Sequence, residues 1–275
     1  MLAPYALGLG VLMALPMAMA LGLSFTEYDA LSPPQWVGLR NYAALWRDPL
    51  FWKALGNSLF FIAASVPLRA LAALLPALLL RADRRGATVY RMAVALPAAV
   101  PEAAYALMWL WFVNPLYGPI NFVLRGLGLP APGWLADPAA AKWVFVMMAV
   151  LEIGEGFLIL LVAVRAASPE SLDAARVDGA NSLRMVWHIL LPHMWPWLAL
   201  LAASDFVYSF RFTFASSYFM TGGDPLYATL FLPLYAHQQS FDSLHFGYGA
   251  ALAVVMLGLG VGAIVAGRRF MDSRL

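Results

Sequence analysis

Apolar residues dominate six long runs of this chain, and short polar stretches separate the runs. Each run is at least as long as the ~20 residues that an α-helix needs to cross a bilayer. The runs cover residues 2–24, 56–80, 91–113, 141–164, 198–219 and 248–267. Prolines inside these runs predict helix breaks, with the freed backbone groups shielded by neighbouring helices. The expected breaks are at Pro67, Pro76, Pro97 and Pro101. The pattern predicts an all-α, polytopic membrane protein with about six transmembrane helices.

The composition supports this reading. The chain has 275 residues, of which 63% are hydrophobic and 12% are charged, whereas soluble domains have about 25% charged residues. A water-soluble fold of this size could not hide so much apolar surface. Cysteine is absent, which excludes disulfides and thiolate metal sites. We find no repeat of fixed period, and we expect one transmembrane domain over residues 1–275.

Basic residues are unevenly distributed between the two sets of loops. The loops after the second and fourth runs and the C-terminal tail carry Arg81, Arg84, Arg85, Arg91, Arg165, Arg176, Arg184, Arg268, Arg269 and Arg274. The opposite side carries only Arg40, Arg47, Lys53, Arg125 and Lys142. Because cytoplasmic loops are enriched in Lys and Arg, we expect both termini and the loop over residues 165–197 in the cytoplasm, with the chain in the inner membrane.

The first apolar run has an alternative interpretation as a signal peptide. Residues 2–17 precede the small-residue sequence Ala18-Met19-Ala20, which resembles a cleavage site. However, a charged segment before the run is missing and the apolar residues continue past the site. We therefore favour a retained transmembrane helix.

The stretch Asp173–Pro192 is a polar interruption with its own helical pattern. Small apolar residues recur at helical spacing before Gly179, and a second pattern begins at Leu183. Gly179 allows the backbone to bend between them. We expect two short helices around this glycine and an interruption of the second helix at Pro192.

This stretch resembles the EAA loop of ABC importer permeases, in which EAA is followed by DGA and then by I-x-LP. The matching positions are Asp173-Ala174-Ala175, Asp178-Gly179-Ala180 and Ile189-Leu190-Leu191-Pro192. Asp173 stands where the family usually has Glu. Within that group the chain looks like the sugar-type, maltose-transporter class. Further matches in the same order are Leu2-Ala3-Pro4-Tyr5, Val37-Gly38-Leu39-Arg40-Asn41-Tyr42, Asn114-Pro115-Leu116-Tyr117-Gly118, Met220-Thr221-Gly222-Gly223 and Phe246-Gly247-Tyr248.

The resemblance implies a type I ABC importer permease fold and a role for the loop. A helix from about Asp173 to Val186 would dock on a separate ATPase subunit, where small alanines allow close approach. The residues expected to couple the two subunits are Asp173, Ala174, Ala175, Arg176, Asp178, Gly179, Ala180, Ile189, Leu191 and Pro192. The alternative is an amphipathic helix that lies on lipid headgroups. Family members usually carry a basic stretch before the first helix, so a late start of this sequence stays open.

The sequence contains no catalytic constellation. No G-x-x-x-x-G-K-[ST] motif occurs, and neither Lys53 nor Lys142 follows a glycine-rich turn. We therefore expect no ATPase activity and no cofactor in this chain, with ATP and Mg²⁺ bound by the partner ATPase. His237, Asp242 and His245 are close enough in sequence for a metal site, but ordinary loop residues are the simpler interpretation, and we predict no metal.

Ionisable residues inside apolar runs are costly, so they usually face the bundle interior or water. Glu152 and Glu155 are three residues apart, which predicts a shared helix face. Carboxylates, hydroxyls and aromatic rings suit sugars. The candidate substrate path is Tyr105, Trp109, Glu152, Glu155, Phe157, Asp205, Tyr208, Ser209 and Phe212. The alternative is structural: Arg69 neutralises one of the acids, the rings pack, and Glu102 and Arg211 reach the interface.

Two positions near the fifth run bear on the resemblance. The family's Phe-Asp pair is Phe214-Ala215 here, so a substrate role of that acid does not carry over. Gly222 and Gly223 predict a tight extracytoplasmic turn that a binding protein could touch.

The resulting expectation is the transmembrane subunit of an ATP-driven, binding-protein-dependent importer of a sugar, oligosaccharide or polyol. Its partners would be a second homologous permease, two copies of an ABC ATPase, an extracytoplasmic solute-binding protein and membrane lipid, and no nucleic acid. One alternative is an ion-coupled secondary transporter that uses Glu102, Glu152, Glu155 or Asp205. Another is a membrane-embedded enzyme, for which the sequence offers no nucleophile–base pair.

Overall fold

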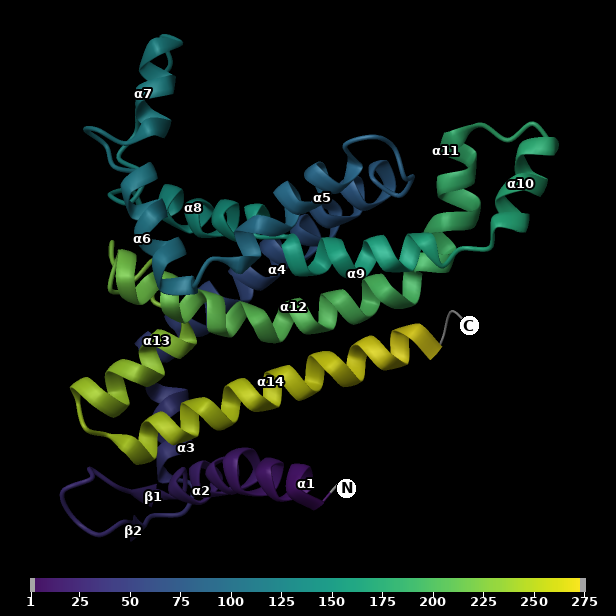
Figure 1. Ribbon diagram of the computed structural model, residues 1–275. Coiled ribbons are helices and arrows are strands. Elements are labelled where there is room, and N and C mark those ends of the chain that lie inside the picture. Colours follow the sequence, from purple (N-terminus) through teal and green to yellow (C-terminus); the bar gives the residue numbers. More distant parts are fainter. Residues whose placement is uncertain (1–2, 273–275) are drawn as a thin grey trace.

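The computed structural model describes residues 3–272 of the chain and consists mainly of helices (Figure 1). The long or apolar elements are α1 (Ala3–Leu9), η1 (Gly10–Ala14), α2 (Leu15–Leu23), α4 (Pro49–Leu79), α5 (Ala87–Ala95), η2 (Leu96–Ala99), α6 (Glu102–Phe112), α8 (Pro138–Leu151), α9 (Gly154–Arg165), α12 (Leu191–Met220) and α14 (Phe246–Asp272). The connecting elements are β1 (Thr26–Glu27), β2 (Gln35–Trp36), α3 (Arg40–Arg47), α7 (Pro119–Gly126), α10 (Pro169–Val177), α11 (Ser182–Met185), η3 (Val186–Leu190), α13 (Leu232–His237) and η4 (Gln238–Asp242). Residue 2 of the first predicted span and Arg274 of the basic tail lie outside the described residues.

The apolar helices lie side by side and give the bundle two distinct ends (Figure 1). Helices α10 and α11 project from one end, which we call the loop end. The antiparallel hairpin of β1 and β2, together with α3, α7 and α13, lies at the other, which we call the hairpin end. Both ends of the described chain point toward the loop end. The predicted basic loops and tail therefore share one end of the bundle.

All six predicted apolar runs coincide with helices. Among residues 3–272, three helices are long and apolar enough to cross a membrane, and up to five spans result if each bent helix pair counts as one. The apolar part of the N-terminal helix, Leu7–Leu23, is shorter. The all-α, polytopic fold expected from the sequence is confirmed.

Proline does not break the second span, contrary to the prediction. Helix α4 continues over 31 residues through Pro67 and Pro76. A proline inside a helix removes one N–H donor but keeps a helical φ. Helices α8, α9 and α12 pack around α4, so tertiary packing offsets the loss of these hydrogen bonds.

Two other spans are broken near their middle. The helix axis turns by 99° between η2 and α6, where Pro97 and Pro101 predicted a break, and by 43° between α8 and α9, where we expected a continuous helix. The two breaks pack on each other. A Cβ on Gly154 would lie 2.6 Å from the Ala95 carbonyl oxygen and 2.7 Å from Ala98 Cβ. Only glycine fits this close approach.

Pro192 does not interrupt the helix that contains it, which is a second correction. The helix is continuous over Ser182–Met220, and Pro192 lies in the first turn of α12. The five residues before α12, Val186–Leu190, form the π-helix η3. Because proline cannot donate the regular hydrogen bond, a locally widened turn accommodates it within a continuous helix.

Among residues 3–272, buried apolar residues form three cores. One, around Leu45 and Leu232, joins α3, α13 and α14, and the other two lie along the bundle with a polar layer between them. The core nearer the hairpin end contains Phe61, Phe145 and Phe212. The core nearer the loop end contains Phe157 and Leu190. Helices α4 and α12 run through both cores, and both helix breaks fall between them. The fold therefore brings the breaks and the buried charges of α4 and α12 to the same level.

Candidate functional site

A buried ion pair joins α4 and α12 in the polar layer. Arg69 Nη2 lies 3.2 Å from Asp205 Oδ1, and each side chain is only 7% exposed. Of the three acids that the sequence offered as partners of Arg69, the structure selects Asp205. The Nε and Nη1 atoms of Arg69 are buried without a hydrogen-bond partner among the described residues.

A second ion pair lies beside the first and involves residues that we had assigned to the membrane interface. Arg211 Nε is 2.5 Å from Glu102 Oε1, and Glu102 is the first residue of α6, directly after the helix break. Tyr208 lies against both arginines, with guanidinium carbons 4.4 Å and 5.2 Å from its ring centroid for Arg69 and Arg211. The side chain of Arg211 is 69% exposed. Such a charge in a span requires water or another protein subunit on that face of α12.

Glu152 and Glu155 do not share a helix face, because the break between α8 and α9 separates them. Glu152 follows the last residue of α8 and is 8% exposed. Its Oε2 atom is buried without a hydrogen-bond partner among the described residues. Glu155 lies in the first turn of α9 and is exposed. The prediction of a common face was wrong because it assumed a continuous helix.

Two adjoining cavities bring these side chains together. One has a volume of about 360 Å³ and is lined by Glu102, Glu152 and Arg211 together with the break at residues 98–101. The other has a volume of about 250 Å³ and includes Arg69, Glu155, Asp205, Tyr208 and Arg211 in its wall. Arg211 belongs to both walls, so the cavities form one polar region.

The remaining candidate substrate-path residues pack inside the protein. Phe157 is fully buried in the core nearer the loop end. Tyr105, Trp109 and Phe212 belong to the other core, where the Tyr105 hydroxyl donates to the Met148 carbonyl at 2.8 Å and Phe212 stacks on Phe61. The Ser209 hydroxyl donates to the carbonyl of Asp205 within the same helix. In this conformation these residues support the polar layer from both sides.

The loop end has the two short helices predicted around Gly179. Gly179 has a φ of +77°, and its N–H donates to the Arg176 carbonyl while Ala180 N–H donates to the Ala175 carbonyl. This pair of bonds is the Schellman motif that ends many helices and places glycine at the left-handed position. The Asn181 side chain then accepts from Arg184 N–H at 2.8 Å and starts α11. A single helix over Asp173–Val186 is therefore not formed.

The predicted coupling residues divide between an exposed tip and a partly buried base. Asp173 and Arg176 form an ion pair of 2.5 Å on α10, and the neighbouring Val177 is 88% exposed. Ala174, Asp178 and Gly179 are also exposed, while Ala175 and Ala180 are half-buried. Ile189, Leu191 and Pro192 lie instead at the base of the long helix beside the buried Leu190. The tip thus presents small, charged and apolar groups beyond the bundle.

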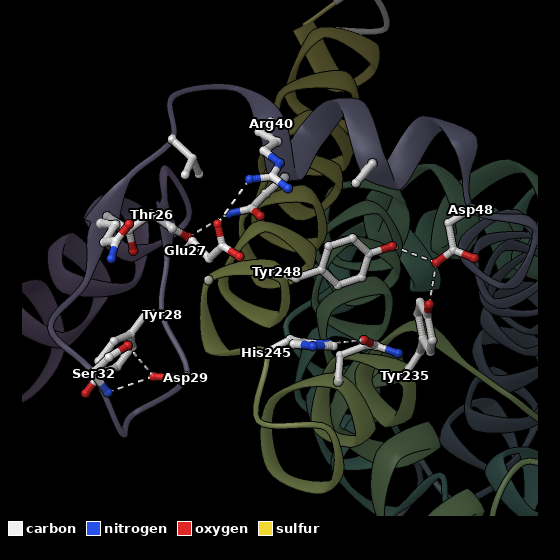
Figure 2. Close-up of a pocket in the computed structure, with 16 residues that line it drawn as sticks. Thr26, Glu27, Tyr28, Asp29, Ser32, Arg40, Asp48, Tyr235, His245 and Tyr248 are labelled. Atoms are coloured by element: carbon white, nitrogen blue, oxygen red, sulfur yellow. Dashed lines mark hydrogen bonds and ion pairs between the residues drawn. The ribbon is translucent and has the colours of Figure 1, made fainter.

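A pocket of about 740 Å³ opens at the hairpin end, between β1, α3 and the start of α14 (Figure 2). Tyr235 and Tyr248 point at Asp48 from different elements and donate their hydroxyls to its Oδ2 atom. Burial alone would raise the pKa of Asp48, but these hydrogen bonds and that from Leu50 N–H hold the pKa below its usual value. Asp48 also caps α4. The hydroxyls therefore join α13 and α14 to the start of α4.

Other loop residues at the hairpin end form turns and ring contacts. Gly222 and Gly223 have φ values of +62° and +106° and form the predicted tight turn after α12. His237 packs against the rings of Phe214 and Phe241. Within residues 3–272, no three His, Cys, Asp or Glu side chains come together as metal ligands.

These features define a class: a multi-pass helical membrane protein with a polar layer between broken helices and a projecting helical loop. The family model for the binding-protein-dependent transport system inner membrane component matches residues 52–272. The chain belongs to this family, the non-enzymatic membrane component of ABC transporters.

The chain is similar in sequence to ABC transporter permeases over most of its length. The chain is 32% identical over 262 residues to the probable ABC transporter permease YesP of Bacillus subtilis, covering 93% of this chain and 84% of the relative. It is 31% identical over 262 residues to the sulfoquinovosyl glycerol transport system permease SmoG of Agrobacterium fabrum, covering 94% and 85%. A bacterial alginate ABC transporter, solved with an alginate-bound periplasmic protein, contains a chain of the same fold with a TM-score of 0.84. That match has 19% identity and covers 97% of this chain and 91% of the other.

Sequence reasoning set aside or missed three parts of this site. The Glu102–Arg211 pair was assigned to the interface because each residue was judged by its distance from a span end. Gly154 was missed, although a Gly-Glu-Gly segment after an acid inside an apolar run is a signal for a helix break. The contacts of Asp48 with Tyr235 and Tyr248 join residues far apart in sequence, and no local pattern indicates them.

Proposed function

We propose that this chain forms one half of the membrane channel of an ATP-driven importer for a sugar, oligosaccharide or related polyol. It works with a second homologous permease, two copies of an ABC ATPase and an extracytoplasmic solute-binding protein. The loop end faces the cytoplasm, and ATP and Mg²⁺ are bound by the partner ATPase. Family membership supports the transporter class. The relative named for sulfoquinovosyl glycerol and the similar structure of an alginate transporter support the substrate class.

The proposed substrate path rests on one observation, the polar layer at the level of the helix breaks. Glu152, Tyr208 and Arg69 supply hydrogen-bonding groups there, and the exposed Arg211 marks the face of α12 that borders water or the second permease. A substrate that passes between the two permeases meets this layer between two apolar cores. The layer therefore acts as the selective part of the path.

The proposal for coupling to the ATPase rests on the projecting loop of α10 and α11. A preformed pair of helices loses little conformational entropy when it docks. The exposed Val177, the small side chain of Ala174 and the bare backbone of Gly179 suit a groove on another subunit better than they suit water. Movement of the ATPase is then transmitted through α11 and η3 to α12, which is one continuous helix as far as the polar layer.

Substitution at Gly179 tests this coupling. A side chain in the left-handed conformation costs about 1–2 kcal/mol, and within this chain a Cβ there would meet nothing within 4 Å. We expect Gly179→Val to insert normally but to reduce ATPase co-purification or to uncouple ATP hydrolysis from uptake. Gly262→Val is the matched control, since Gly262 lies in α14 with open space and no positive φ.

The assay uses the complete complex, which is purified from the native host through a tag on this chain. Mass spectrometry identifies the partner subunits. Normal ATPase retention and normal uptake in Gly179→Val would contradict the docking role of the loop. Uptake in proteoliposomes that lack any ATPase would instead support an ion-coupled transporter that uses the carboxylates of the polar layer.

A further inference from the structure

An apolar groove of about 1010 Å³ opens near the loop end, between α4, α14 and the helix formed by α11, η3 and α12. Helix α14 packs beside α12 (Figure 1). At Gly267 in the groove wall, however, a Cβ would meet nothing within 4 Å, so the two helices do not close the groove at this level. Leu71, Leu75 and Leu79 of α4 line it and are 57%, 61% and 79% exposed. The bundle alone therefore leaves a deep apolar surface uncovered.

The groove lies on the side of α12 that is turned away from the polar cavities. Leu198, Ala202 and Phe206 belong to the groove wall, whereas Tyr208 and Arg211 belong to the wall of a polar cavity. With 3.6 residues per turn, these two sets occupy opposite sides of the helix. The exposed Arg211 marks the face that borders water or the second permease. The groove is therefore turned away from that face and toward the surrounding lipid.

The groove is about one lipid leaflet deep. Its walls include residues 67–79 of α4 and residues 195–206 of α12. At 1.5 Å per residue these stretches are about 16–18 Å long, close to half of the ~30 Å hydrocarbon core of a bilayer. Trp187 and Trp195 line the part of the groove nearer the loop end, and tryptophan rings favour the level of the headgroups. An acyl chain of one leaflet has a matching depth.

Arginines follow the groove residues at the loop end. Arg184 comes directly after Leu183 of the groove wall, and Arg268 and Arg269 come directly after Gly267. All three arginines are exposed, and such long side chains extend along apolar surface toward the headgroups. No Asp or Glu occurs in the segments 67–82, 183–204 and 243–271. The loop end of the groove therefore offers positive charge to an anionic headgroup, as basic pockets between transmembrane helices do.

We propose that this groove binds an anionic phospholipid of the cytoplasmic leaflet, in the orientation proposed above. An acyl chain lies against the leucines of α4 and the apolar face of α12, and the phosphate group contacts Arg184, Arg268 and Arg269. The lipid completes the packing between α12 and α14 near the loop end. Selection by headgroup charge distinguishes this site from an ordinary apolar surface, which accepts zwitterionic and anionic lipids alike. The site is separate from the substrate path and does not depend on which substrate is transported.

Photolabelling of the complete complex in vesicles tests the inference. The vesicles consist of phosphatidylcholine with a small fraction of phosphatidylglycerol that carries a diazirine on one acyl chain. In a second preparation, phosphatidylcholine carries the same diazirine at the same fraction. Mass spectrometry identifies the modified peptides after illumination. We expect phosphatidylglycerol to label residues 67–79 and 195–206 at least about fivefold more than phosphatidylcholine does, since one arginine beside an anionic headgroup strengthens binding by roughly that factor.

Charge variants separate the groove from the rest of the surface. Arg184→Gln/Arg268→Gln should bring the labelling by phosphatidylglycerol to within about twofold of that by phosphatidylcholine, because most of the attraction to the headgroup is lost. Arg47→Gln/Lys53→Gln removes the same formal charge from exposed residues at the hairpin end and should leave the preference unchanged. Loss of the preference in both double variants would show that net charge, and not this groove, selects the lipid, and would overturn the inference.

A variant that fills the groove tests its occupancy. Gly267→Leu places a side chain in the open loop end of the groove and should lower labelling by either lipid. Gly262→Leu is the matched control, because Gly262 lies on the same helix with open space but outside the groove wall. Equal labelling of the unsubstituted chain by the two lipids would overturn the inference whether or not any variant assembles. Crosslinking of benzoylphenylalanine at Leu75 to another subunit, in place of lipid, would assign the groove to a protein partner and would also overturn it.

Discussion

Removing Arg69 should destabilise the assembled protein more than any exposed substitution. In the Arg69→Leu variant, Asp205 stays buried at 7% side-chain exposure without its counter-ion. Breaking a buried ion pair by removal of one partner costs about 3–5 kcal/mol, because an uncompensated charge remains. The variant also loses the contact between the guanidinium and Tyr208. At about 2–4 °C per kcal/mol for a domain of 150–250 residues, the expected loss in melting temperature is about 6–20 °C.

The assay is the melting temperature of the purified complex in detergent, together with the yield of assembled complex. The double variant Arg69→Met/Asp205→Asn removes both charges and should recover most of the loss, since replacing both members of a buried pair is often close to neutral. Exchanging the two residues, Arg69→Asp/Asp205→Arg, should recover part of it. Arg47→Leu, at an exposed arginine of α3, is the control and should change little. An unchanged melting temperature and unchanged uptake in Arg69→Leu would refute the reasoning.

The remaining predictions concern the helix breaks, the loop end and the topology. Gly154→Ala places a Cβ against backbone and should cost about 1–3 kcal/mol in thermal unfolding. Gly156→Ala meets the flexible end of Leu201 at 3.1 Å and Ala73 Cβ at an ordinary 3.6 Å, so it should cost less. Equal losses would contradict the close packing of the breaks. Hydrogen bonds from Arg91 and Arg165 lower the pKa of Asp83, so its contribution to stability is present above its ordinary pKa of 3.8 and is lost as the pH falls through the lower, folded-state pKa. The difference in melting temperature between the natural chain and Asp83→Asn should stay constant between pH 5 and 8 and shrink only in stronger acid. An impermeant maleimide should label Ala136→Cys in intact cells and Arg85→Cys only after permeabilisation; the opposite pattern would invert the proposed orientation.

The periodicity and composition of the sequence determined the fold class. A run of about 20 apolar residues has few options other than a transmembrane helix, and the described part of each predicted run is mainly helical, with breaks in two of them. The turn at Gly179 was also accessible locally, because a glycine between two helical patterns indicates a left-handed helix end. The predictions that the structure confirmed rest on residues that lie within one or two helical turns of each other.

Tertiary contacts decided where helices break and which charges meet. Pro67 stays within α4, which α8, α9 and α12 surround, and Pro192 follows the π-helix η3 within one continuous helix. Helix α8 ends before Gly154, where the other break packs closely. The choice of Asp205 as the partner of Arg69 depends on how α4 and α12 pack, which neither helix encodes alone. The local sequence determines how stable a helix or a turn is when its segment is considered alone. The polar layer exists only where four segments, far apart along the chain, are brought to one level.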